Sequence, residues 1–236
     1  GGRGDIASPA PRPAGIRAGA GTRAGAAGTN ATTVSQMALP LAWPADESDS
    51  DFIISTANQE AVRHLEHWSL WPVMATVLTG PRKSGRSLLA RLFAQKARGV
   101  IIDDAERRDE EEIFHAWNAA QATRRPLLIV ADARPPAWRV TLPDLGSRLA
   151  ATPSAVIADP DDVLIRALFE KAFAGRGIMV PPELAGWLVP RVERSYVAVG
   201  RIVDLLDHAA LAEQRRLTMP LARRVLAPMI DPVAAT

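Results

Sequence analysis

Eight residues, from Gly80 to Ser87, have the types and spacing of a loop that binds phosphate groups. The string Gly-Pro-Arg-Lys-Ser-Gly-Arg-Ser matches the pattern G-x-x-x-x-G-[K]-[ST], except that Arg86 stands where lysine is usual. Glycines let backbone N–H groups turn toward an anion, and a helix that begins near Gly85 adds its positive end. Ser87 offers a hydroxyl to a magnesium ion. The loop therefore predicts a nucleotide-binding site.

Arginine at position 86 changes the chemistry expected of this loop. Its guanidinium is a planar fork that prefers bidentate contacts, whereas lysine presents a compact ammonium to a phosphate in transfer. We therefore expect nucleotide binding with weak or absent hydrolysis. The alternative is a glycine-containing turn with a solvated basic cluster. The candidate residues of the loop are Gly80, Pro81, Arg82, Lys83, Ser84, Gly85, Arg86, Ser87 and Leu88.

Carboxylates follow two apolar runs downstream of the loop. The run 99–102 ends in Asp103 and Asp104, and the run 126–130 is soon followed by Asp132. If a triphosphate is bound, Asp103 is expected to orient the water held by Mg²⁺. Neither neighbour of Asp103 is the glutamate that efficient ATPases use to activate water, which again favours slow turnover. The alternative is a strand-end turn in which Asp103 and Asp104 cap the following residues.

Alternating strand and helix patterns position these motifs. Continuous apolar strands that alternate with helices predict a parallel sheet covered on both faces. Only about a dozen residues separate Ser87 from the second strand, so we expect a shortened sheet. A first helix is expected where Thr56 and Gln59 match a capping box. The predicted strands are 73–78, 99–102, 126–130 and 154–158. The predicted later helices are 161–174, 182–190, 195–213 and 219–226, a small all-helical domain.

Composition narrows the class of protein. The chain has 236 residues, of which 47% are apolar, enough for one substantial core and a small helical domain. No apolar stretch approaches the roughly 20 residues that span a bilayer, and no secretory signal is evident. We expect a soluble, cytoplasmic protein with no membrane partner. The absence of cysteine excludes disulfides and thiolate metal sites, and the four histidines are scattered.

The basic N-terminal segment differs from the rest of the chain. Residues 1–33 contain four arginines, one aspartate and half of all glycines, so residues 34–236 carry a net charge of −1. Such a composition is typical of disorder, and charge does not mark the body as a nucleic-acid binder. We expect residues 1–33 to be upstream or otherwise non-native sequence, with Val34 as a natural start. A basic arm is the alternative.

Taken in order, the motifs resemble the DnaA-like ATPases of the AAA+ family, and specifically the short Hda group that lacks the DNA-binding domain. Phe52 to Asn58 is similar to the segment that packs near adenine, and Gly85-Arg86-Ser87 to the arginine-bearing phosphate loop of Hda proteins. The other matching segments are 101–104 (Walker B), 127–136 (sensor 1), 142–149 (the box with the arginine finger) and 193–195 (sensor 2). The resemblance covers residues 36–226.

The resemblance implies a fold and a division of the chain. It implies an AAA+ P-loop base, a three-layer α/β/α parallel sheet over residues 51–159, followed by a helical lid over residues 160–236. It implies ADP or ATP as the ligand, with Mg²⁺ for a triphosphate. Phe52, Asn58 and Arg194 would then join the nucleotide site. A solvated position beside Glu193 is the alternative for Arg194.

The resemblance also implies a role and partners. The nucleotide-bound protein would sit on the replication sliding clamp, stimulate ATP hydrolysis by DnaA and so limit initiation. Arg148 would be the arginine finger offered in trans. Its alternative is a surface pair with Asp144, four residues earlier. A homodimer is a further candidate assembly. No helix-turn-helix pattern follows Leu226, so sequence-specific DNA binding is not expected.

A short peptide before the base resembles the clamp-binding peptide of Hda proteins. The glutamine amide can fix the register, and the aliphatic side chains can fill an apolar groove on an extended strand. A hydrophobic tail that folds back on the body is the alternative. Residues 34–50 are interpreted as this peptide and its linker. The clamp-binding candidates are Gln36, Met37, Leu39, Pro40 and Leu41.

Three functions remain open from the sequence. The first is the clamp-tethered, ADP-holding regulator, which would bind a diphosphate tightly and hydrolyse almost none alone. The second is an autonomous P-loop ATPase, which Arg86 and the pair Asp103-Asp104 make less favourable. The third is an adaptor without nucleotide in replication or cell-cycle control. Which nucleotide is held, and whether the protein is a monomer or a dimer, is not decided by the sequence.

Overall fold

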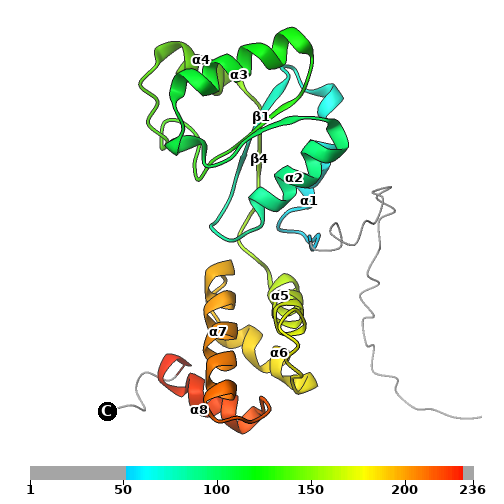
Figure 1. The fold of residues 1–236 in the computed structure, drawn as a ribbon, viewed down its shortest axis with the longest axis vertical. Helices are drawn as coiled ribbons and strands as arrows, with labels where there is room; N and C mark the ends of the chain where they lie inside the picture. The colour runs from blue at the N-terminus through cyan, green and yellow to red at the C-terminus, as the bar shows by residue number, and fades with distance from the viewer. Residues whose placement is uncertain (1–51, 231–236) are drawn as a thin grey trace, which may run out of the picture. The chain divides into compact units, whose positions relative to one another are not determined.

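The computed structural model describes residues 52–230, which comprise an α/β base followed by a helical lid (Figure 1). The predicted parallel α/β fold with a helical region after it is confirmed. The predicted disordered segment 1–33 and the clamp-binding peptide within 34–50 lie outside the described residues. Among the helices described, none combines the length and the apolarity that crossing a bilayer requires.

The base is built on a sheet of four parallel strands. They are β1 (Ala75–Thr79), β2 (Val100–Ile102), β3 (Leu127–Val130) and β4 (Ser154–Val156), in the order β2-β3-β1-β4. Leu78 lies opposite Val130, and Ile102 lies opposite Ile129. Every residue of β1 and β3 is buried, as expected of central strands covered on both faces. Because the strands are parallel, all their carboxyl ends lie at one edge.

Two pairs of helices cover the sheet. Helices α1 (Gln59–Glu66) and α2 (Arg86–Ala97) pack on one face, and α3 (Glu110–Thr123) and α4 (Pro143–Ala151) pack on the other (Figure 1). The core under the second pair contains Ile113, Leu145 and Leu149, none of which is exposed. The result is a three-layer base whose loops at one edge of the sheet are free to build a site.

The sheet is short because α2 is followed almost at once by β2. Arg98 ends α2 in the left-handed conformation, with φ of 51°, and Gly99 leads directly into the strand. A Cβ at Gly99 would lie 2.9 Å from the carbonyl oxygen of Pro126, so only glycine permits this close approach. Strand β2 is an edge strand in this sheet, and Val100 is partly exposed on it.

The predicted capping box at Thr56 is wrong. Helix α1 begins at Gln59, its N-cap is Asn58, and no side chain caps it. The Asn58 amide donates to the Ile53 carbonyl at 2.8 Å and accepts from the Ser55 N–H at 2.9 Å, which forms a turn before the helix. The Thr56 hydroxyl donates instead to the Asp161 carboxylate, far along the chain. A distant partner therefore replaces the local one.

The lid has its own hydrophobic core. Its helices are α5 (Asp162–Ala174), α6 (Pro182–Leu188), α7 (Tyr196–Ala212) and α8 (Met219–Ile230), with a short 3₁₀ helix, η4 (Val189–Arg191), after α6. Phe169, Val203 and Leu206 are fully buried where these helices meet. Asp161 caps α5 by accepting from the Leu164 N–H at 2.7 Å. Helix α8 runs four residues beyond the predicted end at 226, with Pro228 inside it.

Candidate nucleotide-binding site

Two glycines shape the loop between β1 and α2. Gly80 has φ of +158°, and a Cβ there would lie 2.8 Å from the Ile157 carbonyl oxygen. Gly85 has φ of +89°, and a Cβ there would lie 3.1 Å from the ring of Phe52. Any larger residue would displace β4 in the first case and the aromatic ring in the second. The loop is therefore a close-fitting cradle of backbone atoms.

The loop presents donors and a buried hydroxyl to one side of the cradle. Helix α2 begins at Arg86 without a side-chain cap, so its first N–H groups are available to an anion. Ser84 is 7% exposed, and its hydroxyl has no hydrogen-bond partner among the described residues. A buried polar atom without a partner is costly unless a bound molecule completes it. Arg82 and Lys83 are exposed around this point.

Arg86 is engaged with the protein itself. Its side chain is only 12% exposed, and its Nη2 lies 2.5 Å from Oδ1 of Asp132. Its Nη1 donates to the carbonyl oxygen of Ala131. The hydrogen bond from Arg86, aided by the charges of Arg86 and Arg82, lowers the pKa of the Asp132 carboxyl despite partial burial. The guanidinium therefore joins α2 to the end of β3.

The Walker B candidates have local partners. Asp103 follows β2 and accepts the Asp104 N–H at 3.0 Å. Asp104 adopts the left-handed conformation, with φ of 52°, and pairs with Arg107 at 3.5 Å. These are the features of the strand-end turn considered as the alternative. The carboxylates still lie at the same edge of the sheet as the phosphate loop, because β2, β3 and β1 are adjacent.

Glu106 is a site residue that the sequence did not reveal. It lies in the 3₁₀ helix η3 (Ala105–Arg107), and its Oε1 accepts the N–H groups of Asp132 and Ala133, the latter at 3.1 Å. This carboxylate fixes the exit of β3 and so the position of Asp132. Its partners are backbone amides, which any residue type supplies, and no motif could therefore have identified it.

A cleft lies beside the phosphate loop and between the base and the lid. Its volume is about 180 Å³. The base contributes residues that the sequence had selected: Phe52, Asn58, Lys83, Ser84, Gly85 and Leu88, together with Ile53. The lid contributes residues that the sequence had not selected: Leu164, Leu168, Lys171 and Tyr196. The amide of Asn58 donates one hydrogen bond to the backbone and accepts one from it, so its orientation in the wall of the cleft is fixed.

Tyr196 anchors the lid at this cleft. Its hydroxyl donates to the Ala158 carbonyl oxygen at 3.1 Å, which lies in the connection between β4 and α5. Burial, with the charges of Asp159 and Asp161, raises the pKa of Tyr196 to about 12. The phenol is therefore protonated at neutral pH and stays a donor, which holds the start of α7 against the base.

Two predicted arginines lie outside the cleft. Arg194 pairs with Asp162 at 3.0 Å, and both side chains are more than half exposed. Arg148 lies on α4 with its guanidinium carbon 4.4 Å from the ring centre of Phe114 and 5.3 Å from that of Trp117. Its Nη1 donates to the backbone oxygen of Asp144 at 3.2 Å, so the contact with that residue is not an ion pair of side chains.

Glu110 determines how the helix of Arg148 is placed. Its carboxylate accepts the N–H groups of Thr141, at 2.9 Å, and Leu142, at 2.6 Å, just before α4. These backbone hydrogen bonds lower the pKa of Glu110. The start of α4 is thereby tied to the start of α3, and Arg148 is held over the aromatic side chains of α3.

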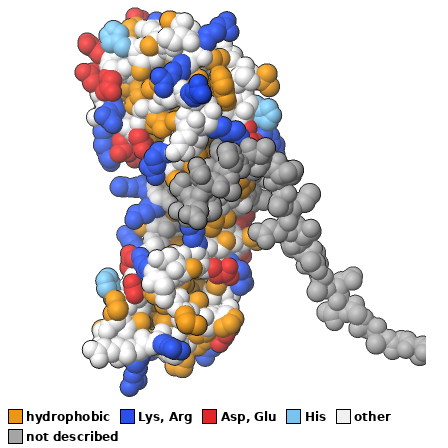
Figure 2. Space-filling model, turned by 45° about the vertical axis from the view of Figure 1, so that its right-hand side comes forward, with side chains coloured by type: hydrophobic (Ala, Val, Ile, Leu, Met, Phe, Trp, Pro, Cys, Tyr) orange, Lys and Arg blue, Asp and Glu red, His pale blue; other side chains and the backbone are white. Residues whose placement is uncertain are grey.

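The charged surface of the described residues is mixed. On the face shown in Figure 2, Lys and Arg side chains are interspersed with Asp, Glu and apolar side chains. This agrees with the small net charge of residues 34–236. The two remaining loop candidates are half-buried: Pro81 lies in the loop, and Ser87 lies in the first turn of α2.

Comparison with known proteins finds a family model similar to the lid and a relative similar to part of the chain. Residues 161–226 match the family model of the Hda lid domain. An uncharacterized protein of Haemophilus influenzae is 34% identical over 133 residues, which are 54% of this chain and 58% of that protein. The chain thus matches less than two thirds of that relative's length.

Solved structures share the fold at low sequence identity. Domain III of the Thermotoga maritima replication initiation protein DnaA superimposes with a TM-score of 0.62 at 14% identity, over 78% of this chain and 97% of that one. DnaA from Aquifex aeolicus, bound to AMPPCP, superimposes with a TM-score of 0.53 at 14% identity, over 71% of this chain and 67% of that one.

Proposed function

We infer that this chain, an Hda-like AAA+ protein by its lid and its fold, is a nucleotide-holding regulator of DNA replication initiation. The observation that carries the proposal is the place of the Hda-type lid. Its helices α5 and α7 supply one wall of the cleft whose other wall is the phosphate loop. A role in replication control implies that the protein acts in the cytoplasm.

The chemistry of the cleft fits a nucleotide. The orphaned Ser84 hydroxyl, the exposed Lys83 and the uncapped start of α2 are suited to phosphate oxygens. The apolar wall formed by Phe52, Leu164 and Leu168 suits a base. A volume of about 180 Å³ is below the roughly 300–1,000 Å³ of whole-ligand pockets, so the enclosed part would take a portion of the molecule.

We propose ADP as the nucleotide held. Arg86 is already committed to Asp132, and a third phosphate near that carboxylate would meet a like charge. Without a free cation at this position, hydrolysis by the protein alone would be slow. Ser87 and Asp103 would hold Mg²⁺ only if a triphosphate entered. Calorimetry with ADP and with ATP tests this, and preference for ATP with rapid turnover would instead identify an autonomous ATPase.

We propose that Arg148 acts on a partner's nucleotide. A guanidinium supplied in trans stabilises the charge that develops on a transferred phosphoryl group, worth on the order of 10³-fold or more in rate. The proposed partner is DnaA, whose AAA+ domain has the same fold. Stacking on Phe114 keeps the guanidinium ordered on α4 at the surface of the base.

The first experiment measures ATP hydrolysis by DnaA with and without the protein. We expect Arg148→Ala to reduce the stimulation about 10³-fold while ADP binding is retained. Arg139→Ala is the matched control, because Arg139 is an exposed arginine in the segment just before α4. Full stimulation by the Arg148 variant would show that Arg148 is not an arginine finger for DnaA.

The second experiment addresses the sliding clamp. We propose that Gln36, Met37, Leu39, Pro40 and Leu41 bind it. A variant with Gln36→Ala and Leu39→Ala is expected to lose co-elution with the clamp and to keep its nucleotide. Unchanged co-elution would exclude this peptide as the tether, without affecting the assignment of the nucleotide cleft.

A further inference from the structure

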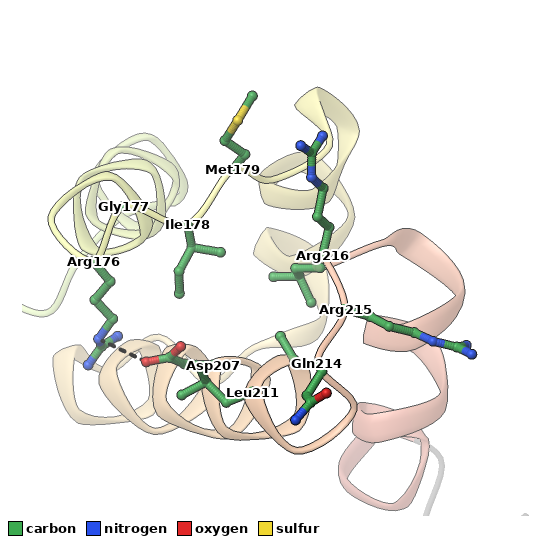
Figure 3. A pocket seen from close by; sticks show the side chains of 11 residues that line it. Arg176, Gly177, Ile178, Met179, Asp207, Leu211, Gln214, Arg215 and Arg216 are labelled. Atoms are coloured by element: carbon green, nitrogen blue, oxygen red, sulfur yellow. Dashed lines mark ion pairs between the residues drawn. The ribbon is translucent and has the colours of Figure 1, made fainter.

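The lid carries a second hollow that is separate from the nucleotide cleft. It lies among the end of α5, the segment after it, the end of α7 and the loop that follows α7 (Figure 3). Its volume is about 580 Å³, within the range of clefts that receive several side chains or a small ligand. No residue that lines it also lines the cleft beside the phosphate loop.

The walls of this hollow are largely apolar. Ile178 points into it (Figure 3), and the buried Leu217 also lines it. Met179 is 77% exposed and Leu211 is 67% exposed at its rim. Single exposed apolar residues are ordinary on a protein surface, but several around one hollow indicate a surface that gains free energy when covered.

The charges around the hollow fall into two groups. Arg176 pairs with Asp204 and, at 3.8 Å, with Asp207, so its charge is compensated within the lid. Arg215 and Arg216 are exposed, and neither guanidinium has a hydrogen bond or an ion pair within residues 52–230. Positive charge is therefore available at one side of the hollow only.

A neighbouring hollow shares these two arginines. It has a volume of about 440 Å³ and is lined by Arg215, Arg216, Pro220 and Leu221, among others. Arg224, also at its rim, is already paired with Glu213. Arg215 and Arg216 thus form a ridge that borders two hollows, of which the first is largely apolar and the second combines Pro220 and Leu221 with polar and charged side chains. We call the ridge and the two hollows the end-of-lid groove.

We propose that the end-of-lid groove binds an acidic segment of a partner protein. Adjacent carboxylates of the segment meet Arg215 and Arg216, because a guanidinium and a carboxylate form short, charge-assisted hydrogen bonds. Aliphatic side chains on either side of those carboxylates enter the two hollows. This interaction goes beyond the proposed nucleotide-dependent role, since it uses neither the cleft nor Arg148.

The distribution of charge favours a peptide over a nucleic acid. Asp207 lines the first hollow, and Asp207 and Asp204 share the single positive charge of Arg176, so negative charge remains on that side. A continuous row of phosphates would pass these carboxylates and be repelled, whereas a peptide can carry its negative charge at the ridge alone. The apolar wall of the first hollow also accepts aliphatic side chains, which a sugar–phosphate backbone does not have.

The test uses a fluorescent synthetic peptide with a pair of glutamates flanked on both sides by leucines. Its anisotropy is followed as the full chain is added. The Arg215→Glu, Arg216→Glu double variant is expected to bind at least about 10-fold more weakly, since hydrogen bonds to charged groups are lost and like charges introduced. A peptide with glutamine in place of glutamate is expected to bind the wild-type protein similarly weakly. The Leu211→Gln variant is also expected to bind the glutamate peptide more weakly, because Leu211 lies at the rim of the apolar hollow.

Arg201→Glu is the matched control. Arg201 is exposed on α7 and lines neither hollow, so its variant should bind as the wild type does. Equal weakening by the control would show nonspecific charge attraction and overturn the proposal. So would absence of peptide binding, competition by single-stranded DNA, or a concentration-dependent dimer that the double variant abolishes. Retained ADP binding by all variants keeps this result separate from that of the nucleotide cleft.

Discussion

The loop beside the proposed nucleotide cleft and the end-of-lid groove both contain arginine, but they differ in what the arginine contacts. In the loop, Arg86 is 12% exposed and is held by Asp132 and the Ala131 carbonyl. In the groove, Arg215 and Arg216 are exposed, and their guanidinium groups have no partner within residues 52–230. A paired arginine fixes the shape of a site, whereas an unpaired one remains available to a carboxylate from another molecule.

Helices α5 and α7 support both the proposed nucleotide cleft and the end-of-lid groove. Helices α5 and α7 line the cleft with residues near their first turns, such as Leu164 and Tyr196. Residues at or beyond their last turns, such as Arg176 and Leu211, line the groove. The core of the lid lies between these ends. Substitutions in that core should affect both sites, and substitutions at either end should affect one.

The largest effect is expected from Phe169→Ala. Phe169 is fully buried where α5 meets the rest of the lid core. Removal of a buried phenyl ring costs about 3–5 kcal/mol, a large part of the roughly 5–15 kcal/mol that stabilises a domain. Urea denaturation should show this loss, and both ADP and peptide binding should weaken.

Val163→Ala is its control on the same helix. Val163 is 73% exposed, so its variant should change stability by less than about 0.5 kcal/mol. If Phe169→Ala weakened peptide binding but left ADP binding intact, the base would hold the nucleotide without the lid. The shared support described above would then be wrong for the cleft.

Gly80→Ala should separate the two sites. The added Cβ would meet the Ile157 carbonyl oxygen at 2.8 Å and the Ile157 Cβ at 2.9 Å, so β4 or the loop must shift. Overpacking of this kind costs about 1–3 kcal/mol. ADP binding should be lost and peptide binding kept. Gly200→Ala, in α7 with nothing within 4 Å of the new Cβ, is the matched change.

The smallest effect is expected from Asp132→Asn, when stability is measured as a function of pH. The pKa of Asp132 is lowered in the folded protein, mainly by Arg86, so the pair stabilises the protein above the unfolded pKa of about 3.9. That contribution is lost as pH falls through the folded pKa. Because the carboxyl is 53% exposed, screening limits the contribution to less than about 1 kcal/mol.

Stability measured between neutral pH and pH 2 checks this prediction. The wild type should lose slightly more stability below pH 4 than the variant does, and the difference should shrink in high salt. Identical acid profiles would mean that the Arg86–Asp132 contact contributes nothing to folding. Arg86 would then differ from Arg215 and Arg216 only in its position, and not in a contribution to the free energy of unfolding.

Local patterns were enough to predict the elements and the loop. Glycines at 80 and 85, apolar runs of strand length and helical periodicity beyond 160 each depend on neighbours within a few residues. The short link between Ser87 and the second strand likewise predicted a shortened sheet. Where a local signal competed with a distant partner, as at Thr56, the sequence prediction failed.

By itself, then, the sequence determined the type of fold, the position of the loop 80–87 that we propose binds phosphate, and the carboxylates that follow the strands. Only the tertiary structure decided which of these groups are engaged. Arg86 meets Asp132 across 46 residues, Tyr196 meets Ala158 across 38, and the end-of-lid groove joins α5 to the loop after α7. Such pairings depend on how helices and strands pack, because side chains distant in sequence become neighbours only after the core forms.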